Sequence, residues 1–309
     1  MSTPSSSTAP ASAPVEPAPA PQASTSRAGR NLPAAITVAL SLIALLVLTL
    51  AFRPEPFVVL VVVAIGGGLW ELRGAFETVD IKLPIWPLLV GGVGMAVSTF
   101  AGGAQALMIA FVLTVAVTCV WRIAEMLPGE RGRAAGRDIA ASVFASTWLP
   151  FLACFLILVL AQDRGNWRVV MLILLPVASD TGGYIAGVLF GKHPMAPSVS
   201  PKKSWEGFIG SVILAAVAGF LGSHFILGFP WLPGEGGALL QSSLVLGLIL
   251  GVVVAATATL GDLAESLIKR DLGLKDMGDL LPGHGGILDR VDSILITAPF
   301  LYLLLVIAA

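Results

Sequence analysis

Apolar residues run through most of the chain in long segments that short polar loops separate. An α-helix rises 1.5 Å per residue, so about 20 apolar residues cross the roughly 30 Å hydrocarbon layer of a membrane. Each segment is near this length, and membrane helices tolerate the glycines and prolines within them. The pattern predicts an all-α fold, a polytopic integral membrane bundle of about nine transmembrane helices. The nine segments cover residues 33–52, 56–72, 84–100, 104–121, 139–161, 168–190, 207–229, 239–260 and 291–309.

The composition agrees with a lipid environment. Hydrophobic types make up 56% of the 309 residues and charged types only 12%, which is about half the charged fraction of a soluble domain. A water-soluble core cannot hide that much apolar surface. Cys119 and Cys154 lie within apolar segments, so they are interpreted as small core residues and not as a disulfide or metal site.

The first 30 residues have a different composition, dominated by Ser, Pro and Ala, and predict a disordered tail. Arg27 and Arg30 precede the first apolar segment, as basic residues do in a signal peptide. That segment, from Pro33 to Phe52, is longer than the roughly 7–15 residues of a signal-peptide core. We therefore expect an uncleaved first helix, with a cytoplasmic tail over 1–30 and a transmembrane domain over 31–309.

The basic residues predict the orientation of the bundle, because Lys and Arg accumulate in cytoplasmic loops. If all nine segments cross the membrane, fifteen of the 18 Lys and Arg residues fall on one side. The other three, Arg53, Arg164 and Arg168, fall on the opposite side. We therefore expect a multi-pass protein of the cell membrane with a cytoplasmic N-terminus, an external C-terminus, and polar loops at 191–207 and 275–293 that face the cytoplasm.

The polar stretch GDLAESLIKRDLGLKD, residues 261–276, follows the eighth apolar segment. Asp262, Glu265, Ser266 and Lys269 are spaced to share one helix face, and Arg270 is adjacent. A solvated helix end has the same pattern. An acid at the edge of a membrane span nevertheless favours a functional interpretation.

The stretch LLPGHGGILDRVD, residues 280–292, combines a turn, two glycines and two acids. Gly285 and Gly286 precede a helical run, where their backbone N–H groups could form an anion-binding nest. Asp289 and Asp292 are three residues apart and share a helix face. Because Mg²⁺ takes one or two carboxylates plus substrate phosphates, the combination predicts a metal and nucleotide-phosphate site. His284, alone in a loop, also fits a structural role.

Two further stretches place polar groups at or inside the membrane. SDTGGYIAG, residues 179–187, puts Asp180 within the sixth apolar segment, which indicates a partner or a water-filled cavity, while its glycines allow close helix packing. SPKKSWEG, residues 200–207, carries Lys202 and Lys203. This basic pair could hold anionic lipid headgroups, although lysines at such positions often only set the topology.

These stretches together resemble the phosphatidate cytidylyltransferase family, also called the CDP-diacylglycerol synthases. The 27 positions from Ser266 to Asp292 match the family signature without departure. SPKKSWEG resembles a second motif, with Ser204 where Thr is frequent, and SDTGGYIAGVLFGK resembles a third, with Val188 where many members have a basic residue. The resemblance covers roughly residues 33–309.

The resemblance implies a nucleotidyltransferase of membrane phospholipid biosynthesis that converts CTP and phosphatidate to CDP-diacylglycerol and pyrophosphate. It implies Mg²⁺ as the cofactor, with K⁺ as a candidate second cation. The expected partners are CTP, phosphatidate and membrane lipids, with no nucleic acid, and a homodimer is among the arrangements left open. The implied active site faces the cytoplasm.

The residues predicted for this site fall into three groups. The metal ligands are Asp262, Asp289 and Asp292, of which the first two lead. The catalytic group is Lys269, Arg270, Lys275, Asp276, His284 and Arg290. The substrate-binding group is Asp180, Lys202, Lys203, Ser266, Gly285 and Gly286.

Two other functions were weighed. A transporter could use Asp180 as its cation site, but it would need polar groups along a path to both faces, and here the charge gathers on one side. Another membrane enzyme that uses CTP, such as a polyprenol kinase, would not be expected to carry the complete signature. The enzyme interpretation is therefore preferred.

Overall fold

The computed structural model describes residues 32–126, 132–232, 239–278, 280 and 285–308. The N-terminal tail and His284 lie outside this part. Helices dominate the described residues, which confirms the all-α fold class, and a short antiparallel pair, β1 and β2, is the one sheet found among them. The elements are α1 (Leu32–Ala51), α2 (Glu55–Glu77), α3 (Ile85–Met126), α4 (Gly132–Ser146), η1 (Thr147–Phe151), α5 (Leu152–Leu160), α6 (Gly165–Phe190), β1 (Pro194–Ala196), β2 (Ser200–Ser204), α7 (Trp205–Leu221), η2 (Gly222–Ile226), η3 (Leu239–Gln241), α8 (Ser243–Asp271) and α9 (Leu288–Ala308).

Seven helices of the described part are long and apolar enough to cross a membrane, and the apolar part of α1, Leu40–Ala51, is shorter. The predicted segments 84–100 and 104–121 are the two halves of α3, which Gly103 breaks with φ 66° and ψ −153°. Gly91 in the first half faces Thr114 in the second. These residues would lie about 35 Å apart on a straight helix, so α3 folds back on itself. The count of nine spans and the side of the N-terminus stay predictions.

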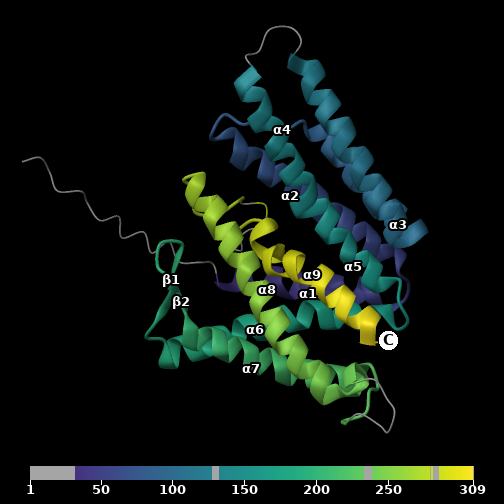
Figure 1. Ribbon diagram of the computed structural model, residues 1–309, viewed down its shortest axis with the longest axis vertical. Coiled ribbons are helices and arrows are strands. Elements are labelled where there is room, and N and C mark those ends of the chain that lie inside the picture. Colours follow the sequence, from purple (N-terminus) through teal and green to yellow (C-terminus); the bar gives the residue numbers. More distant parts are fainter. Residues whose placement is uncertain (1–31, 127–131, 233–238, 279, 281–284, 309) are drawn as a thin grey trace, which may run out of the picture.

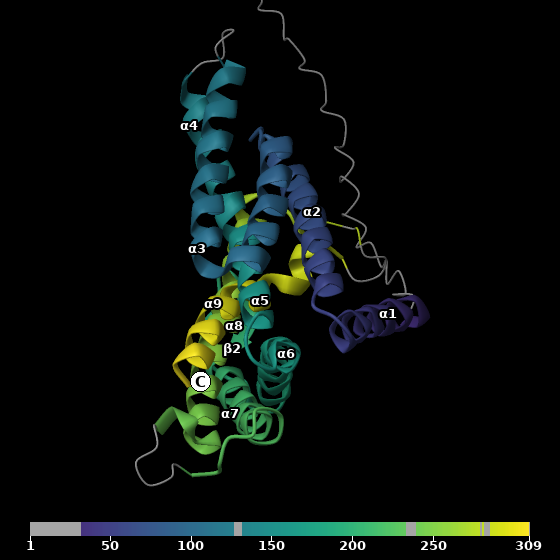
Figure 2. The same cartoon turned by 90° about the vertical axis from the view of Figure 1, so that its right-hand side faces the viewer.

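The helices form two connected groups (Figures 1 and 2). α2, α3 and α4 make up one end of the molecule, while α6, α7 and α8 pack together at the other. Between them, η1 carries the chain past Pro150 from α4 into α5 as a π-helical turn, which relieves the backbone where proline lacks an N–H. α9 packs against both α8 and α5 and so joins the two groups.

The glycines of α6 and α7 bring these two helices very close together, as the sequence predicted. A Cβ atom added to Gly182 would lie 2.4 Å from the carbonyl oxygen of Gly210. Ser211 also donates a hydrogen bond of 2.8 Å from its hydroxyl to the carbonyl of Ser179. In lipid, where helices gain little from excluding water, such close packing and interhelical hydrogen bonding hold a pair together. The contact fixes the part of α6 that carries Asp180.

α8 and α9 make a second close contact. A Cβ atom added to Gly261 would lie 2.6 Å from the carbonyl oxygen of Asp292, and one turn away the hydroxyls of Thr257 and Thr297 share a hydrogen bond of 3.0 Å. Both pairs belong to one antiparallel register. Gly261 directly precedes Asp262, so a glycine of α8 brings the backbone beside one predicted metal-binding acid close to the backbone of another, Asp292.

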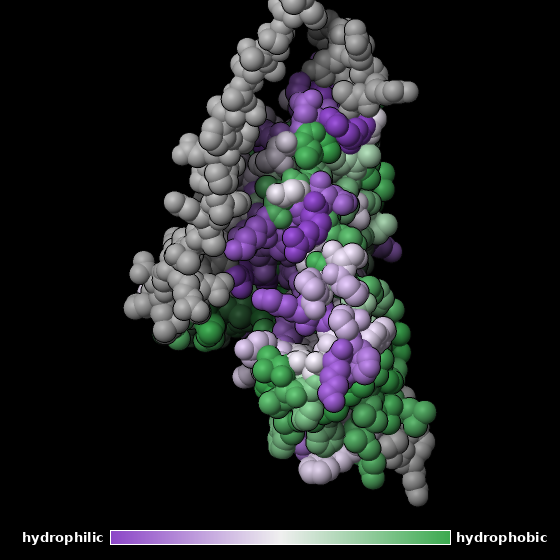
Figure 3. All heavy atoms as spheres, turned by 90° about the vertical axis from the view of Figure 1, so that its left-hand side faces the viewer, coloured by the Kyte–Doolittle hydropathy of each residue, from purple (hydrophilic) through white to green (hydrophobic). Residues whose placement is uncertain are grey.

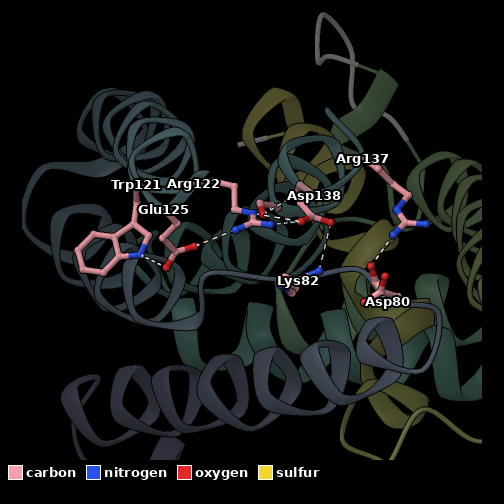
Figure 4. A network of polar contacts seen from close by, with 8 residues as sticks. Asp80, Lys82, Trp121, Arg122, Glu125, Arg137 and Asp138 are labelled. Atoms are coloured by element: carbon pink, nitrogen blue, oxygen red, sulfur yellow. Dashed lines mark hydrogen bonds and ion pairs between the residues drawn. The ribbon is translucent and has the colours of Figure 1, made fainter. Parts of the chain in front are cut away.

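A buried ion pair joins α3 to α4 in the group formed by α2, α3 and α4 (Figure 4). The guanidinium of Arg122 on α3 pairs with Asp138 on α4, and both side chains are at most 3% exposed. Asp138 also accepts a hydrogen bond of 3.2 Å from the backbone N–H of Lys82, and Arg137 donates to the carbonyl of Asp80. This Arg122–Asp138 clamp ties the loop after α2 to α3 and α4.

We expect Gly261→Ala to lower the unfolding temperature of the protein in detergent, since the added methyl group overlaps the α9 backbone and overpacking costs about 1–3 kcal/mol. Gly74→Ala is the matched control, because nothing lies within 4 Å of a Cβ at this position of α2. Thermal unfolding of both variants is the measurement. An unfolding temperature for Gly261→Ala equal to that of Gly74→Ala would contradict the close contact.

Candidate active site

A cavity of about 330 Å³ lies between β2, α6, α7 and α8. It brings together four of the predicted site residues from three separate motifs: Asp180, Lys202, Lys203 and Asp262. The ammonium of Lys203 on β2 pairs with the carboxylate of Asp262 on α8. Asp180 on α6 lies within electrostatic range of both. The cavity therefore offers two lysines and two carboxylates at the point where a strand meets three membrane helices.

The short sheet that carries Lys202 and Lys203 is held in place by Glu206. The carboxylate of Glu206 accepts hydrogen bonds from the backbone N–H groups of Lys192 and His193, at 3.1 and 3.2 Å, and pairs with the His193 ring at 2.5 Å. Ser204 caps α7 by accepting a 3.1 Å hydrogen bond from the N–H of Gly207. Within the motif at 200–207, Glu206 and Ser204 therefore fix the backbone by hydrogen bonds, and Lys202 and Lys203 line the cavity.

A second polar cluster lies where α8 meets the start of α9. Lys269 pairs with Asp289 at 2.8 Å and with Glu265 at 3.4 Å. Glu265, only 2% exposed, also lies beside Asp292. Asp292 is within electrostatic range of Asp262 and of Lys269. The cavity and this second cluster are therefore neighbours, linked through Asp262 and Asp292 along the contact between α8 and α9.

The backbone at the start of α9 differs from the predicted phosphate-binding nest. Gly285 adopts φ +83°, which suits glycine, but the N–H of Gly286 donates to the carboxylate of Asp289 at 3.0 Å. The next two N–H groups, of Ile287 and Leu288, donate to Glu71 at 2.9 and 3.0 Å. Carboxylates of the protein occupy these donors. The nest orders the loop, and substrate binding by Gly286 stays a prediction.

Glu71 is the residue of this region that the sequence analysis did not single out. It lies in the second apolar segment, at the end of a run of hydrophobic residues and glycines. The same rule that drew attention to Asp180, that an acid within a membrane helix needs a partner, applies to Glu71 and could have identified it.

The remaining predicted residues lie near the second cluster in the sequence. Ser266 is half-buried on α8. The exposed ones are Arg270 at the end of α8, Lys275 and Asp276 in the following loop, and Arg290 in the first turn of α9. The three cations among them, Arg270, Lys275 and Arg290, lie near Lys269 or Asp289 in the sequence. The structure places His284 outside its described residues, so its predicted role is unchanged.

The donor set was compared with the needs of a divalent ion. Within the described ranges, no group of three or more Asp, Glu, His or Cys side chains is arranged to hold a metal. The side chain of Asp262 is 39% exposed, and both Asp262 and Asp180 line the cavity. One or two carboxylates, completed by phosphate oxygens and water, is how proteins usually hold Mg²⁺ with nucleotides. The residues present therefore fit an ion that arrives with a polyphosphate, while the approach of Asp289 to Asp262 across such an ion stays a prediction.

Hydrophilic residues gather on one face of the molecule, the face that carries the β1–β2 pair, and hydrophobic residues cover the adjacent surface below it (Figure 3). Lipid-exposed helices need an apolar surface, whereas a site for a charged substrate needs access to water. The distribution agrees with a site at the boundary between the two environments.

The chain is similar in sequence to known cytidylyltransferases. A model described as the cytidylyltransferase family matches residues 33–308. The phosphatidate cytidylyltransferase of Mycobacterium leprae is 43% identical over 284 residues, which cover 88% of this chain and 86% of that relative. The enzyme of the same name from Mycobacterium tuberculosis is 39% identical over 281 residues, covering 88% and 81%, and that from Haemophilus influenzae is 41% identical over 161 residues, covering 50% and 53%. This chain, a multi-helix membrane protein, therefore belongs to the cytidylyltransferase family.

Proposed function

We propose that this protein transfers the cytidylyl group of CTP to phosphatidate, giving CDP-diacylglycerol and pyrophosphate, and that the cavity around Lys203 and Asp262 together with the Lys269–Asp289 cluster is where it does so. The location of the site is supported by one observation, that separate motifs meet in space. Three sequence motifs far apart in the chain contribute Asp180, Lys203 and Asp262 to one cavity. The relatives that share most of this chain carry the name phosphatidate cytidylyltransferase.

The chemistry requires two polyanions to meet. A phosphate oxygen of phosphatidate attacks the α-phosphorus of CTP, the new P–O bond forms, and the bond to the β-phosphate oxygen breaks as pyrophosphate leaves. Repulsion between the reactants makes charge neutralisation and alignment the main tasks of the protein. The attacking oxygen is already anionic, so no strong general base is needed, and the proposal assigns none to His284.

The lysines and arginines divide this task by position. Lys202 and Lys203 line the cavity beside α6 and α7, where a lipid phosphate can approach from the membrane. Lys269, Arg270, Lys275 and Arg290 lie on the loop side, where they would pair with the phosphate oxygens of CTP. This arrangement assigns one set of cations to each substrate.

Asp262, Asp289 and Asp292 are the side chains proposed to hold Mg²⁺, with K⁺ as a second cation. When bound with CTP, the ion would neutralise phosphate oxygens and stabilise the leaving pyrophosphate. The protein's own part is to keep these carboxylates oriented. Asp289 accepts hydrogen bonds from the N–H groups of Met277 and Gly286 at 3.2 and 3.0 Å, which fix one of its oxygens.

A transporter that uses Asp180 is the alternative from another functional class. In the structure Asp180 shares its cavity with Lys203 and Asp262 instead of lying alone in the membrane. Together with membership of the cytidylyltransferase family, this pairing favours the enzyme.

The purified protein in detergent should convert CTP and phosphatidate to CDP-diacylglycerol and pyrophosphate when Mg²⁺ is added. ATP should be a much poorer substrate. Both products can be measured in one assay, with diacylglycerol in place of phosphatidate as the control, because it lacks the attacking phosphate. Equal turnover of ATP and CTP, or nucleotide use with diacylglycerol alone, would contradict the proposed reaction.

Asp262→Asn and Asp289→Asn should each lower kcat by at least about 10²-fold, since each removes a carboxylate from the proposed ion site at nearly constant shape. The double variant should be little worse than either single one if both act on one ion. Lys275→Ala should cost less, because several cations share its task. Turnover measured across a Mg²⁺ titration, with membrane insertion checked, tests this, and losses that multiply fully would exclude a shared ion.

The proposed site faces the cytoplasm, where CTP is available, and the N-terminus lies on the same side. Reporter fusions at residue 309 and within the loop 191–206 should therefore report opposite sides of the membrane, because the positive-inside rule places that loop in the cytoplasm. Reporters on the same side would contradict the nine-span topology. A homodimer is likewise proposed, and the mass of the protein in detergent tests it.

A further inference from the structure

Glu71 on α2 is a buried acid, 5% exposed, whose two carboxylate oxygens both bind the start of α9. One oxygen accepts the N–H of Ile287 at 2.9 Å and the other accepts the N–H of Leu288 at 3.0 Å. These are first-turn donors that have no partner within their own helix. The positive end of the α9 dipole faces the same carboxylate and offsets the cost of burying it.

The chain around Glu71 is shaped to receive this carboxylate. A Cβ atom added to Gly278 would lie 2.5 Å from the Cγ of Glu71, and one added to Gly286 would lie 2.7 Å from its Oε2. The acid thus fills the space that two glycines of the loop leave open. Any larger residue at either glycine would have to displace it.

Two glycines of α2 itself complete the contact. Gly67 and Gly68 precede Glu71 by four and three residues and so share its helix face. A Cβ atom added to Gly67 would lie 2.4 Å from the Cδ1 of Ile287, and one added to Gly68 would lie 3.4 Å from the Cδ2 of Leu288. The side chains of Ile287 and Leu288 therefore pack against the two positions of α2 that have no side chain.

Asp289 directly follows this anchored pair. Its position depends on where α9 begins, and its contacts with Lys269, at 2.8 Å, and with the N–H groups of Met277 and Gly286 depend on the same loop. A shift at Ile287 and Leu288 moves Asp289 and the loop together. Misplacement by about 1 Å can cost an enzyme as much as 10²-fold.

We propose that Glu71 is a positioning residue for the reaction: by fixing the start of α9 it sets the aim of Asp289 toward Lys269 and the proposed ion site. The proposal rests on the assignment of Asp289 to that site. It gives α2, which contributes no residue to the predicted motifs, an indirect part in the reaction through Asp289. Within the part of the chain that the structure describes, the Glu71 carboxylate accepts hydrogen bonds from backbone N–H groups of α9, and no contact with substrate is assigned to it.

The test compares Glu71→Gln with Glu71→Asp in the full-length enzyme. Gln has the same size but replaces one acceptor oxygen with an NH₂ donor, so one N–H of α9 loses its partner. We expect kcat per folded molecule to fall at least about 10-fold and the Mg²⁺ concentration for half-maximal activity to rise several-fold. Asp keeps the charge and both acceptor oxygens on a side chain that is one methylene shorter, so Glu71→Asp should have a kcat between those of Glu71→Gln and the unaltered enzyme.

Asp138→Asn is the matched control, because Asp138 is also a buried carboxylate that accepts a backbone N–H, from Lys82 at 3.2 Å, but it belongs to the Arg122–Asp138 clamp. It should lower the unfolding temperature and leave kcat and the Mg²⁺ dependence of the folded fraction unchanged. The proposal is overturned if Glu71→Gln behaves like this control, with only stability affected.

Gly278→Ala covers the case in which Glu71→Gln does not fold, since the new methyl group pushes the Glu71 carboxylate aside without removing charge, and it should raise the Mg²⁺ requirement in the same way. Normal kcat and Mg²⁺ dependence in folded Gly278→Ala would also overturn the proposal. Failure of the underlying site is distinguishable. If Asp289→Asn stays active, the site assignment is wrong, whereas inactive Asp289→Asn beside fully active Glu71→Gln rejects the role of Glu71 alone.

Discussion

A charge inside a lipid-embedded bundle must meet a partner where helices touch, because the hydrocarbon offers it no water. The contact between α8 and α9 meets this requirement for Glu265, Asp289 and Asp292. Gly261 lets the two backbones approach, and the register that follows places Lys269 against Asp289 at 2.8 Å and brings Asp292 beside Glu265. Without that approach, several carboxylates at the ends of two apolar helices would be left unpaired. The close glycine contact is therefore a condition for the polar site.

The same constraint limits where the proposed site can lie along the membrane normal. One substrate is a lipid and the other a soluble nucleotide, so the reacting groups must meet at the boundary between hydrocarbon and water. The cavity that holds Lys203 and Asp262 joins a membrane helix to a strand pair outside the helices. Its shape is built by backbone features: a hydrogen-bonded turn around Glu206 and the tight packing of α6 on α7 at Gly182. Rigid supports of this kind keep charged side chains aligned without a large aqueous cavity.

The sequence predicted the helical class, most helix positions and the segments that line the cavity, because hydrophobic length and local glycine patterns are local properties. It could not predict the tight reversal at Gly103 between the two helices that it placed at 84–100 and 104–121, because this reversal depends on a single backbone conformation. The sequence also could not predict which groups bind the backbone N–H groups at the start of α9. Gly286 and Leu288 bind carboxylates, and one of these, from Glu71, comes from more than 200 residues away in the chain. A local sequence pattern identifies hydrogen-bond donors, but it does not show which distant acceptor the fold brings to them.

Charge balance connects the structure to the proposed reaction. Each of the two aspartates that lead as metal ligands is already paired with a lysine: Asp262 with Lys203, and Asp289 with Lys269. These pairs neutralise the carboxylates while no nucleotide is bound, which lowers the cost of keeping them near lipid. Asp262 and Asp289 are the side chains proposed to hold a divalent ion that accompanies CTP, and Lys203 and Lys269 would then be available to pair with phosphate oxygens. In the proposed mechanism the lysines would therefore pair with the aspartates in one state and with the substrates in the other.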